Sequence, residues 1–470
     1  MIRKTKIIIT VGPKTASLKM LRLLIQKGAN VVRLNFSHLS HEKAMQIISN
    51  VKEINQELGV HTAILADLQG PKIRLGDFEK PIRLKKGAEI VFCTKNKKNT
   101  VHIDYKKFAK DLKPKDRVLV DDGKVGLEVL STNNKDRVVL KALFGGVLYP
   151  RKGVNLPNTN ISLPSITKKD TKDLNFILSQ KIEWIGLSFV RRAKDIKDLK
   201  KIIKKNGSTH KVVAKIEKPE AIKNINSIIE FSDAIMVARG DLGVEVQPQK
   251  VPVYQKMIVN KCIEKSTPVI IATQMLESMT ISPTSTRAEA NDVANSVIDG
   301  ADALMLSGET SVGKYPLKAI DTMKKIIKGI EASDHSISKN TEASEIQKDS
   351  RFLTNAICLN ATNIAEQSNA KAIITNTYSG FNTIKVSSFR PHAFIYAFTN
   401  NHTILNTLSL VWGVEGFYYE GASTTSQTIK ETKEVLKKSK RLRKGDLVVN
   451  IASMPARDKG MTNMMKISKV

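Results

Sequence analysis

Short apolar segments rich in β-branched residues recur along the chain, and each is followed by a polar or glycine-containing turn and then by apolar residues at helical spacing. Parallel strands that are buried on both faces read as such continuous apolar runs. Eight strands alternating with helices favour a closed TIM (β/α)8 barrel, because an open doubly wound sheet usually has fewer strands and a glycine-rich first turn. The predicted strands are Lys6–Val11, Asn30–Leu34, Ala63–Asp67, Trp184–Phe189, Val212–Glu217, Ala234–Ala238, Val269–Thr273 and Ala303–Leu306.

The regular spacing is interrupted between the third and the fourth predicted strand. The residues in between alternate apolar and polar positions in short stretches, such as Glu89–Cys93, Arg117–Val120 and Arg137–Leu143, with a turn at 121–123. This pattern predicts a small β-barrel domain inserted after strand three. In a (β/α)8 barrel that position lies at the mouth formed by the carboxyl ends of the strands, where an insert can act as a lid.

Beyond Pro316 the pattern predicts one more helix and then a linker in the polar stretch Ala332–Asp349. The remainder predicts a separate C-terminal α/β domain with strands at Ala372–Thr375, Ala393–Phe398 and Leu447–Ile451. We therefore expect three domains, which are the barrel from 1–70 and 156–345, the inserted lid from 71–155, and the α/β domain from 346–470.

Composition narrows the possible functions only a little. With 41% hydrophobic and 26% charged residues, the chain is typical of a soluble globular protein, and it lacks the long apolar run of a membrane-spanning helix. Cys93, Cys262 and Cys358 form no zinc or disulfide pattern, which indicates a reducing cytoplasm. The net charge of +31 suggests anionic partners. Nucleic-acid binding is one alternative, but the lysine runs lack the interleaved aromatic residues that stack on bases.

Polar residues interrupt the apolar strands mainly at their carboxyl ends, which form the active face of such a barrel. Glu217 and Asp241 follow consecutive strands, so their side chains can converge. Two carboxylates without a nearby histidine or cysteine predict an oxygen site for Mg²⁺ or Mn²⁺. The structural alternative is an ion pair between Lys215 and Glu217, with Asp241 capping a turn.

Lys215 beside a divalent cation is suited to stabilising the negative charge of an enolate or a transferring phosphoryl group. Arg33 offers a planar fork for a phosphate, and Thr273 can relay a proton. The residues alone therefore indicate a phosphate- or carboxylate-rich substrate and metal-assisted enolate chemistry. They leave several enzymes open, including a Mg²⁺-dependent aldolase of the enolate type.

Several longer segments form recognisable motifs. They are Lys4–Lys14, Val32–His38, Asp67–Arg74, Lys152–Pro157, Ala214–Ala221, Met236–Glu245, Ala272–Met279, Pro283–Ala294 and Leu306–Pro316. Through these motifs the chain closely resembles the pyruvate kinase family over essentially its whole length. The resemblance implies phosphoryl transfer from phosphoenolpyruvate to ADP, with pyruvate and ATP as products, at the last step of glycolysis. It also implies a cytoplasmic homotetramer.

The resemblance also implies roles for individual residues. Glu217 and Asp241 would hold Mg²⁺, while Lys215, Arg33 and Thr273 would act on the transferring group and the enolate. Contacts to the pyruvate-like carboxylate are implied for Gly240, Asp241 and Thr273. Residues on the nucleotide side would be Asn35, His38, Arg74 and Lys152.

A monovalent cation site is implied at Asn35, Ser37, Asp67 and the backbone of Leu68. Members of the family that require K⁺ typically have a glutamate at the position of Lys72. We therefore expect activity without K⁺, with the ammonium of Lys72 supplying the monovalent charge. The stretch Thr375–Thr383 resembles the family's effector loop only in part, since Phe381 and Asn382 replace the basic or small residues that often occur there, and no particular effector is predicted.

Overall fold

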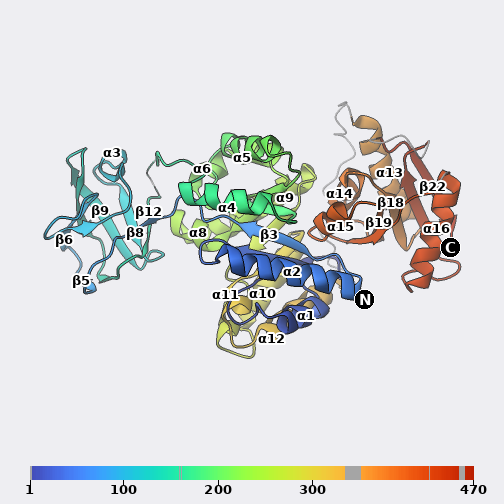
Figure 1. The fold of residues 1–470 in the computed structure, drawn as a ribbon, viewed down its shortest axis with the longest axis horizontal. Coiled ribbons are helices and arrows are strands. Elements are labelled where there is room, and N and C mark those ends of the chain that lie inside the picture. Colours follow the sequence, from blue (N-terminus) through green and yellow to red (C-terminus); the bar gives the residue numbers. More distant parts are fainter. Residues whose placement is uncertain (1–2, 158, 160, 334–350, 423, 455–460) are drawn as a thin grey trace.

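In the computed structural model three bodies lie in a row, with the barrel between the other two (Figure 1). The structure describes residues 3–157, 159, 161–333, 351–422, 424–454 and 461–470. The predicted linker Ala332–Asp349 and the expected boundary at 345/346 lie almost wholly outside these residues. Within them, no helix has both the length and the apolar character needed to cross a membrane.

The central body is a closed barrel of eight parallel strands in the order β1-β17-β16-β15-β14-β13-β3-β2. Its strands are almost entirely buried, which explains why they read as apolar runs in the sequence. They are β1 (Lys6–Thr10), β2 (Val31–Asn35), β3 (Ala63–Asp67), β13 (Trp184–Leu187), β14 (Lys211–Ile216), β15 (Ala234–Ala238), β16 (Val269–Ala272) and β17 (Ala303–Leu306).

All eight predicted barrel strands are confirmed, with differences at their ends. Phe189 and Thr273 were predicted as strand residues, but both lie beyond the strand with positive φ angles of 54° and 69°. The chain therefore turns sharply where it leaves each of these two strands. Because these two strands end earlier than predicted, the polar residues that follow them lie at the mouth of the barrel rather than along its wall.

Helices cover the outside of the barrel (Figure 1). Their apolar faces and the outward-facing strand residues form one large core, while a smaller core fills the barrel interior. The helices are α1 (Leu18–Lys27), α2 (His41–Leu58), α4 (Lys168–Leu178), α5 (Ala193–Lys205), α6 (Pro219–Lys223), α7 (Ile225–Phe231), α8 (Arg239–Glu245), α9 (Val251–Glu264), α10 (Arg287–Ile298), α11 (Gly308–Ser311) and α12 (Pro316–Glu331).

The insert after β3 is β-rich, as predicted, with its own apolar core. Seven of its strands form one sheet in the order β4-β12-β8-β9-β10-β6-β7. Its two edges meet, because Gly76 N donates to His102 O at 2.8 Å and Asp104 N donates to Arg74 O at 2.9 Å. The elements are β4 (Ile73–Arg74), β5 (Ile82–Leu84), β6 (Glu89–Cys93), β7 (Val101–His102), α3 (Phe108–Asp111), β8 (Arg117–Val120), β9 (Val125–Thr132), β10 (Arg137–Ala142), β11 (Gly146–Leu148) and β12 (Gly153–Asn155).

The C-terminal body contains a five-stranded sheet in the order β20-β19-β18-β21-β22. Three of its strands were predicted, whereas β20 and the antiparallel β22 were missed because few of their residues are buried, so neither gives a continuous apolar run. The elements are α13 (Phe352–Gln367), β18 (Ala372–Asn376), α14 (Phe381–Ser388), β19 (Phe394–Thr399), α15 (His402–Leu408), β20 (Val414–Tyr418), α16 (Thr425–Lys438), β21 (Leu447–Ala452) and β22 (Met464–Lys469).

Candidate active site at the mouth of the barrel

Lys215, near the carboxyl end of β14, lies at the centre of a buried charge cluster. Its Nζ donates to Ser188 Oγ at 2.7 Å and pairs with Glu217 Oε1 at 2.9 Å and Asp67 Oδ1 at 3.2 Å. Burial disfavours the charged amine, but the carboxylates of Asp67 and Glu217 outweigh it and raise the pKa of Lys215 above its usual range. The site therefore contains a fixed positive charge that is shielded from water.

Asp67, the last residue of β3, joins Lys215 to Arg33. Its Oδ2 accepts from Arg33 Nε at 2.9 Å and Nη2 at 2.5 Å, so the guanidinium is held in place. Burial opposes ionisation of Asp67, but Lys215 and Arg33 together lower the pKa of this carboxyl. Arg33 Nη1 also donates to Thr10 Oγ1 at 3.1 Å. Asp67 thus orients two cations toward one small region of the mouth.

Glu217 and Asp241 are the predicted metal ligands, and the structure brings their charges together. Burial raises the pKa of Glu217, and the charge of Asp241 raises it further, against the attraction of Lys215. A divalent cation between the two carboxylates would relieve this repulsion, so the donor set fits Mg²⁺ or Mn²⁺. Among the described residues no third histidine, cysteine or carboxylate completes a metal cluster. Oxygens of water and substrate would have to supply the other ligands.

Thr273 follows β16 and lies against the start of α8. Its Oγ1 donates to Ala272 O at 2.5 Å and accepts from Gly240 N at 2.7 Å. The positive φ of Thr273 is uncommon for a β-branched residue. Arg239 supports the turn, because its Nη2 donates to Thr273 O at 2.8 Å while Asp292 binds the same guanidinium. Gly240 and Thr273 are therefore held in contact, as the prediction of a shared substrate site requires.

Lys72 approaches the metal ligands and not the predicted monovalent site. Its Nζ lies 3.5 Å from Asp241 Oδ1, whereas the carboxylate of Asp67 is occupied by Arg33 and Lys215. Asn35 Oδ1 accepts from Ser37 N at 3.1 Å, so this pair is close together beside β2. The structure thus already places a cation beside the cluster, although at a different carboxylate from the one expected.

The four predicted nucleotide residues are divided between two bodies. Asn35 and the exposed His38 lie where β2 leaves the barrel, and His38 N donates to Asn35 O at 3.2 Å. Arg74 is the last residue of β4, and Lys152 directly precedes β12, the strand with which β4 pairs. Lys152 Nζ lies 2.9 Å from Asp121 Oδ1. Arg74 Nη1 donates to Arg151 O at 3.2 Å. The described contacts do not join Arg74 or Lys152 to the Lys215 cluster.

The family model described as the pyruvate kinase barrel domain matches residues 2–320, and the model of the pyruvate kinase alpha/beta domain matches residues 355–468. The chain belongs to the pyruvate kinase family. Pyruvate kinases are phosphotransferases, and the buried cations of this mouth suit that chemistry. The aldolase alternative receives no support from these matches.

Individual pyruvate kinases resemble the chain over nearly its full length. The chain is 40% identical to the pyruvate kinase of Staphylococcus saprophyticus over 474 residues, which covers 100% of this chain and 80% of that protein. It is 40% identical to the enzyme of Geobacillus stearothermophilus, with coverages of 99% and 80%. The crystal structure of a pyruvate kinase from Cryptosporidium parvum superposes with a TM-score of 0.92 at 35% identity, covering 99% of this chain and 96% of that one.

Sequence reasoning missed several parts of this site. Ser188 is a polar residue just beyond β13, which is the same signal that identified the other strand ends, and it contacts Lys215 directly. The amide of Phe189 donates to Glu217 Oε2 at 2.7 Å, a backbone contact that no side-chain pattern indicates. Asp67 was expected only at the monovalent site, whereas it is the carboxylate that links Arg33 and Lys215.

Proposed function

We propose that this chain transfers the phosphoryl group of phosphoenolpyruvate to ADP and releases pyruvate and ATP. The observation that carries the proposal is the buried ammonium of Lys215, held between Asp67 and Glu217 beside Arg33. Phosphoryl transfer needs positioning and neutralisation of charge more than covalent help from the protein. A fixed cation in a water-poor site supplies both.

Each residue of the cluster has a distinct task in this proposal. Arg33 binds the phosphoryl oxygens, and Lys215 stabilises the charge that moves from the phosphoryl group to the enolate oxygen as the bond between them breaks. Gly240 and Thr273, which are held in contact with each other, position the carboxylate of the substrate. Thr273 also lies near the methylene carbon, which takes up a proton when the enolate becomes pyruvate.

Glu217 and Asp241 are the residues that would hold Mg²⁺ or Mn²⁺. The bound cation would neutralise phosphate and enolate oxygens and so favour the transfer. The proposal is supported by the repulsion that raises the pKa of Glu217 next to Asp241. Lys215, which stays charged, keeps Glu217 in place whether or not the metal is present.

The insert acts as a lid over ADP in this proposal, with the domain division 1–70 plus 156–345, 71–155 and 346–470. Asn35 and His38 would contact the nucleotide from the barrel, and Arg74 and Lys152 from the lid. The side chain of Lys152 is 42% exposed, so a phosphate can reach its ammonium. We also propose a cytoplasmic homotetramer, which light scattering of the purified chain would test.

The chain is expected to work without K⁺. The ammonium of Lys72 next to Asp241 supports this, because it already provides a fixed monovalent charge beside the proposed metal ligands. Turnover in K⁺-free Tris buffer should reach at least half of the value in K⁺, and Lys72→Glu should make turnover depend on added K⁺. Strong stimulation of the unmodified chain by K⁺ would refute the proposal.

The function itself is tested by following pyruvate with lactate dehydrogenase and NADH. We expect pyruvate release from phosphoenolpyruvate that requires both ADP and Mg²⁺. Release that is independent of ADP, or no release at saturating substrates, would contradict the proposed reaction.

A further inference from the structure

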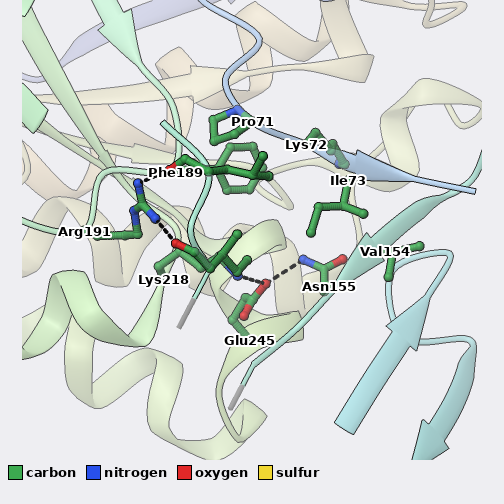
Figure 2. Close-up of a pocket in the computed structure, with 11 residues that line it drawn as sticks. Pro71, Lys72, Ile73, Val154, Asn155, Phe189, Arg191, Lys218 and Glu245 are labelled. Atoms are coloured by element: carbon green, nitrogen blue, oxygen red, sulfur yellow. Dashed lines mark hydrogen bonds and ion pairs between the residues drawn. The ribbon is translucent and has the colours of Figure 1, made fainter. Parts of the chain in front are cut away.

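A second buried ion pair lies next to the site, at the point where the lid rejoins the barrel. Glu245 Oε1, at the end of α8, accepts from Lys218 Nζ at 2.7 Å and from Asn155 Nδ2 at 2.8 Å (Figure 2). The side chain of Glu245 is 0% exposed, and that of Lys218 is 6% exposed. One carboxylate therefore binds two donors from different parts of the chain.

These three residues belong to three elements with different tasks. Asn155 is the last residue of β12, the strand by which the chain leaves the lid. Lys218 directly follows Glu217, and Glu245 lies one helical turn after Asp241 on α8. The Glu245 carboxylate thus connects the lid to both segments that carry the proposed metal ligands.

The pairing is not optimised for stability alone. Glu245 Oε2 and Asn155 Oδ1 are buried without a hydrogen-bond partner among the described residues. Buried acceptors of this kind usually cost free energy, and natural proteins tolerate them mainly where function demands it. A cavity of about 20 Å³ lies beside the pair, lined in part by Ile73, Val154 and Phe189. This space, which is large enough for about one water molecule, leaves the contact room to adjust.

We propose that Asn155, Lys218 and Glu245 are positioning residues that couple the orientation of the lid to the placement of Glu217 and Asp241. The inference rests on the proposed function, in which those carboxylates hold the metal and the lid covers ADP. When the lid moves, β12 carries Asn155 with it, and the amide shifts the carboxylate that also holds Lys218. Coupling of this kind is reciprocal, so metal binding also biases the lid.

The decisive variant is Asn155→Ala, which removes the contact to the lid and leaves the pair of Lys218 with Glu245 intact. We expect the KM for ADP and the half-saturating Mg²⁺ concentration each to rise at least fivefold, while the KM for phosphoenolpyruvate changes less than twofold. The matched control is Val138→Ala, which removes buried methyl groups from the core of the lid on β10, a strand that β8 and β9 separate from β12. It should lower the melting temperature without changing either constant.

A double-mutant cycle separates coupling from two independent defects. If the residues act through one contact, the losses in kcat/KM for ADP caused by Asn155→Ala and Glu245→Gln will not multiply in the double variant. Losses that multiply fully would overturn the proposal. If Asn155→Ala does not fold, Asn155→Ser replaces it. The serine side chain is polar but too short for its hydroxyl to reach Glu245.

A direct measurement of lid position completes the test. Spin labels at Lys135→Cys in the lid and Lys223→Cys in the barrel report their separation, since both sites are exposed and the native cysteines are buried. Adding Mg²⁺ and phosphoenolpyruvate should shift this distance in the otherwise unmodified chain and shift it less with Asn155→Ala. Equal responses in an active enzyme would refute the coupling alone, whereas an inactive unmodified chain would refute the proposed function.

Discussion

The two ends of the barrel contain buried charges in contrasting arrangements. At the amino ends, both oxygens of Asp302 are bound, to Arg390, to Trp412 N and to Val269 N, and Lys6 Nζ donates to Val414 O at 2.6 Å. These partners come largely from the C-terminal body, so the charges fasten it to the barrel.

At the carboxyl ends the charged residues bind one another instead. Lys215 faces two carboxylates, and the proximity of Asp241 raises the pKa of Glu217, which burial has already raised. The same residue types thus hold two bodies together at one end of the barrel, whereas at the other end they form one cluster of cations and carboxylates at the mouth. The partners of a charge at a strand end, rather than its burial, therefore separate a structural role from a catalytic one.

Replacing one lysine at each end of the barrel by methionine should give the largest difference in kcat between the two ends. Lys215→Met should lower kcat on the order of 10³-fold, because it removes a preorganised charge next to the transferring group. The chain should still fold, since Asp67 keeps Arg33 and Glu217 can take up a proton. The measurement is the coupled pyruvate assay, with circular dichroism to verify folding.

Lys6→Met is the matched control at the amino end. Burial lowers the pKa of Lys6 to about 8, and its Nζ binds a backbone carbonyl of the C-terminal body at the opposite end of the barrel from Lys215. Its kcat should stay within about threefold of the unmodified chain. Comparable loss of activity in both variants would erase the contrast between the two ends.

The second prediction concerns the ion pair that fastens the C-terminal body. Asp302→Asn leaves the buried guanidinium of Arg390 without its anion, and breaking such a pair typically costs about 3–5 kcal/mol. Urea unfolding should show this loss, while kcat at low denaturant stays within about threefold. Trp412, whose ring lies 5.1 Å from the Arg390 guanidinium carbon, provides a fluorescence signal from this junction. A variant as stable as the parent would show that the pair does not fasten the body.

The sequence predicted the barrel well, because strands buried on both faces leave an apolar signature that is local. Ala63–Asp67, Ala234–Ala238 and Ala303–Leu306 occupy the predicted residues. The candidate site followed from the rule that polar groups collect at the carboxyl ends of such strands. Those parts of the prediction depend on short-range pattern alone.

Pairings between distant segments could not be predicted in this way. Asp67 meets Lys215, and Asp302 meets Arg390, across long separations in sequence and, for the second pair, across two bodies. Nor does the sequence indicate that the β-branched Thr273 adopts a positive φ, since the support comes from Arg239 on another element. The hydrogen bond between Asn155 of the lid and Glu245 of α8 was missed for the same reason.

The smallest effect expected concerns a carboxyl at the amino end that pairs with no cation among the described residues. Glu183, just before β13, accepts from Asn406 Nδ2 and Ile64 N, each at 2.8 Å, and burial raises its pKa to about 7. Between about pH 5 and pH 7 the folded chain therefore holds a proton that the unfolded chain has lost. Stability should fall as pH rises through this interval and level off above it, with a total contribution of about 3 kcal/mol.

Glu183→Gln tests this, because an amide imitates the protonated acid at every pH and Asn406 can turn its own amide to match. The stability of both chains is measured by urea unfolding at about pH 5.5 and about pH 8. Between these two pH values the parent should lose roughly 2 kcal/mol more stability than the variant. The kcat of the variant should be unchanged. At the other end, Glu217→Gln should abolish Mg²⁺-dependent activity at both pH values. If the stability of Glu183→Gln depended on pH as strongly as that of the parent, Glu183 would be ionised throughout this range. The amino end would then tolerate a buried carboxylate that meets no cation among the described residues, unlike Glu217, which is paired with Lys215.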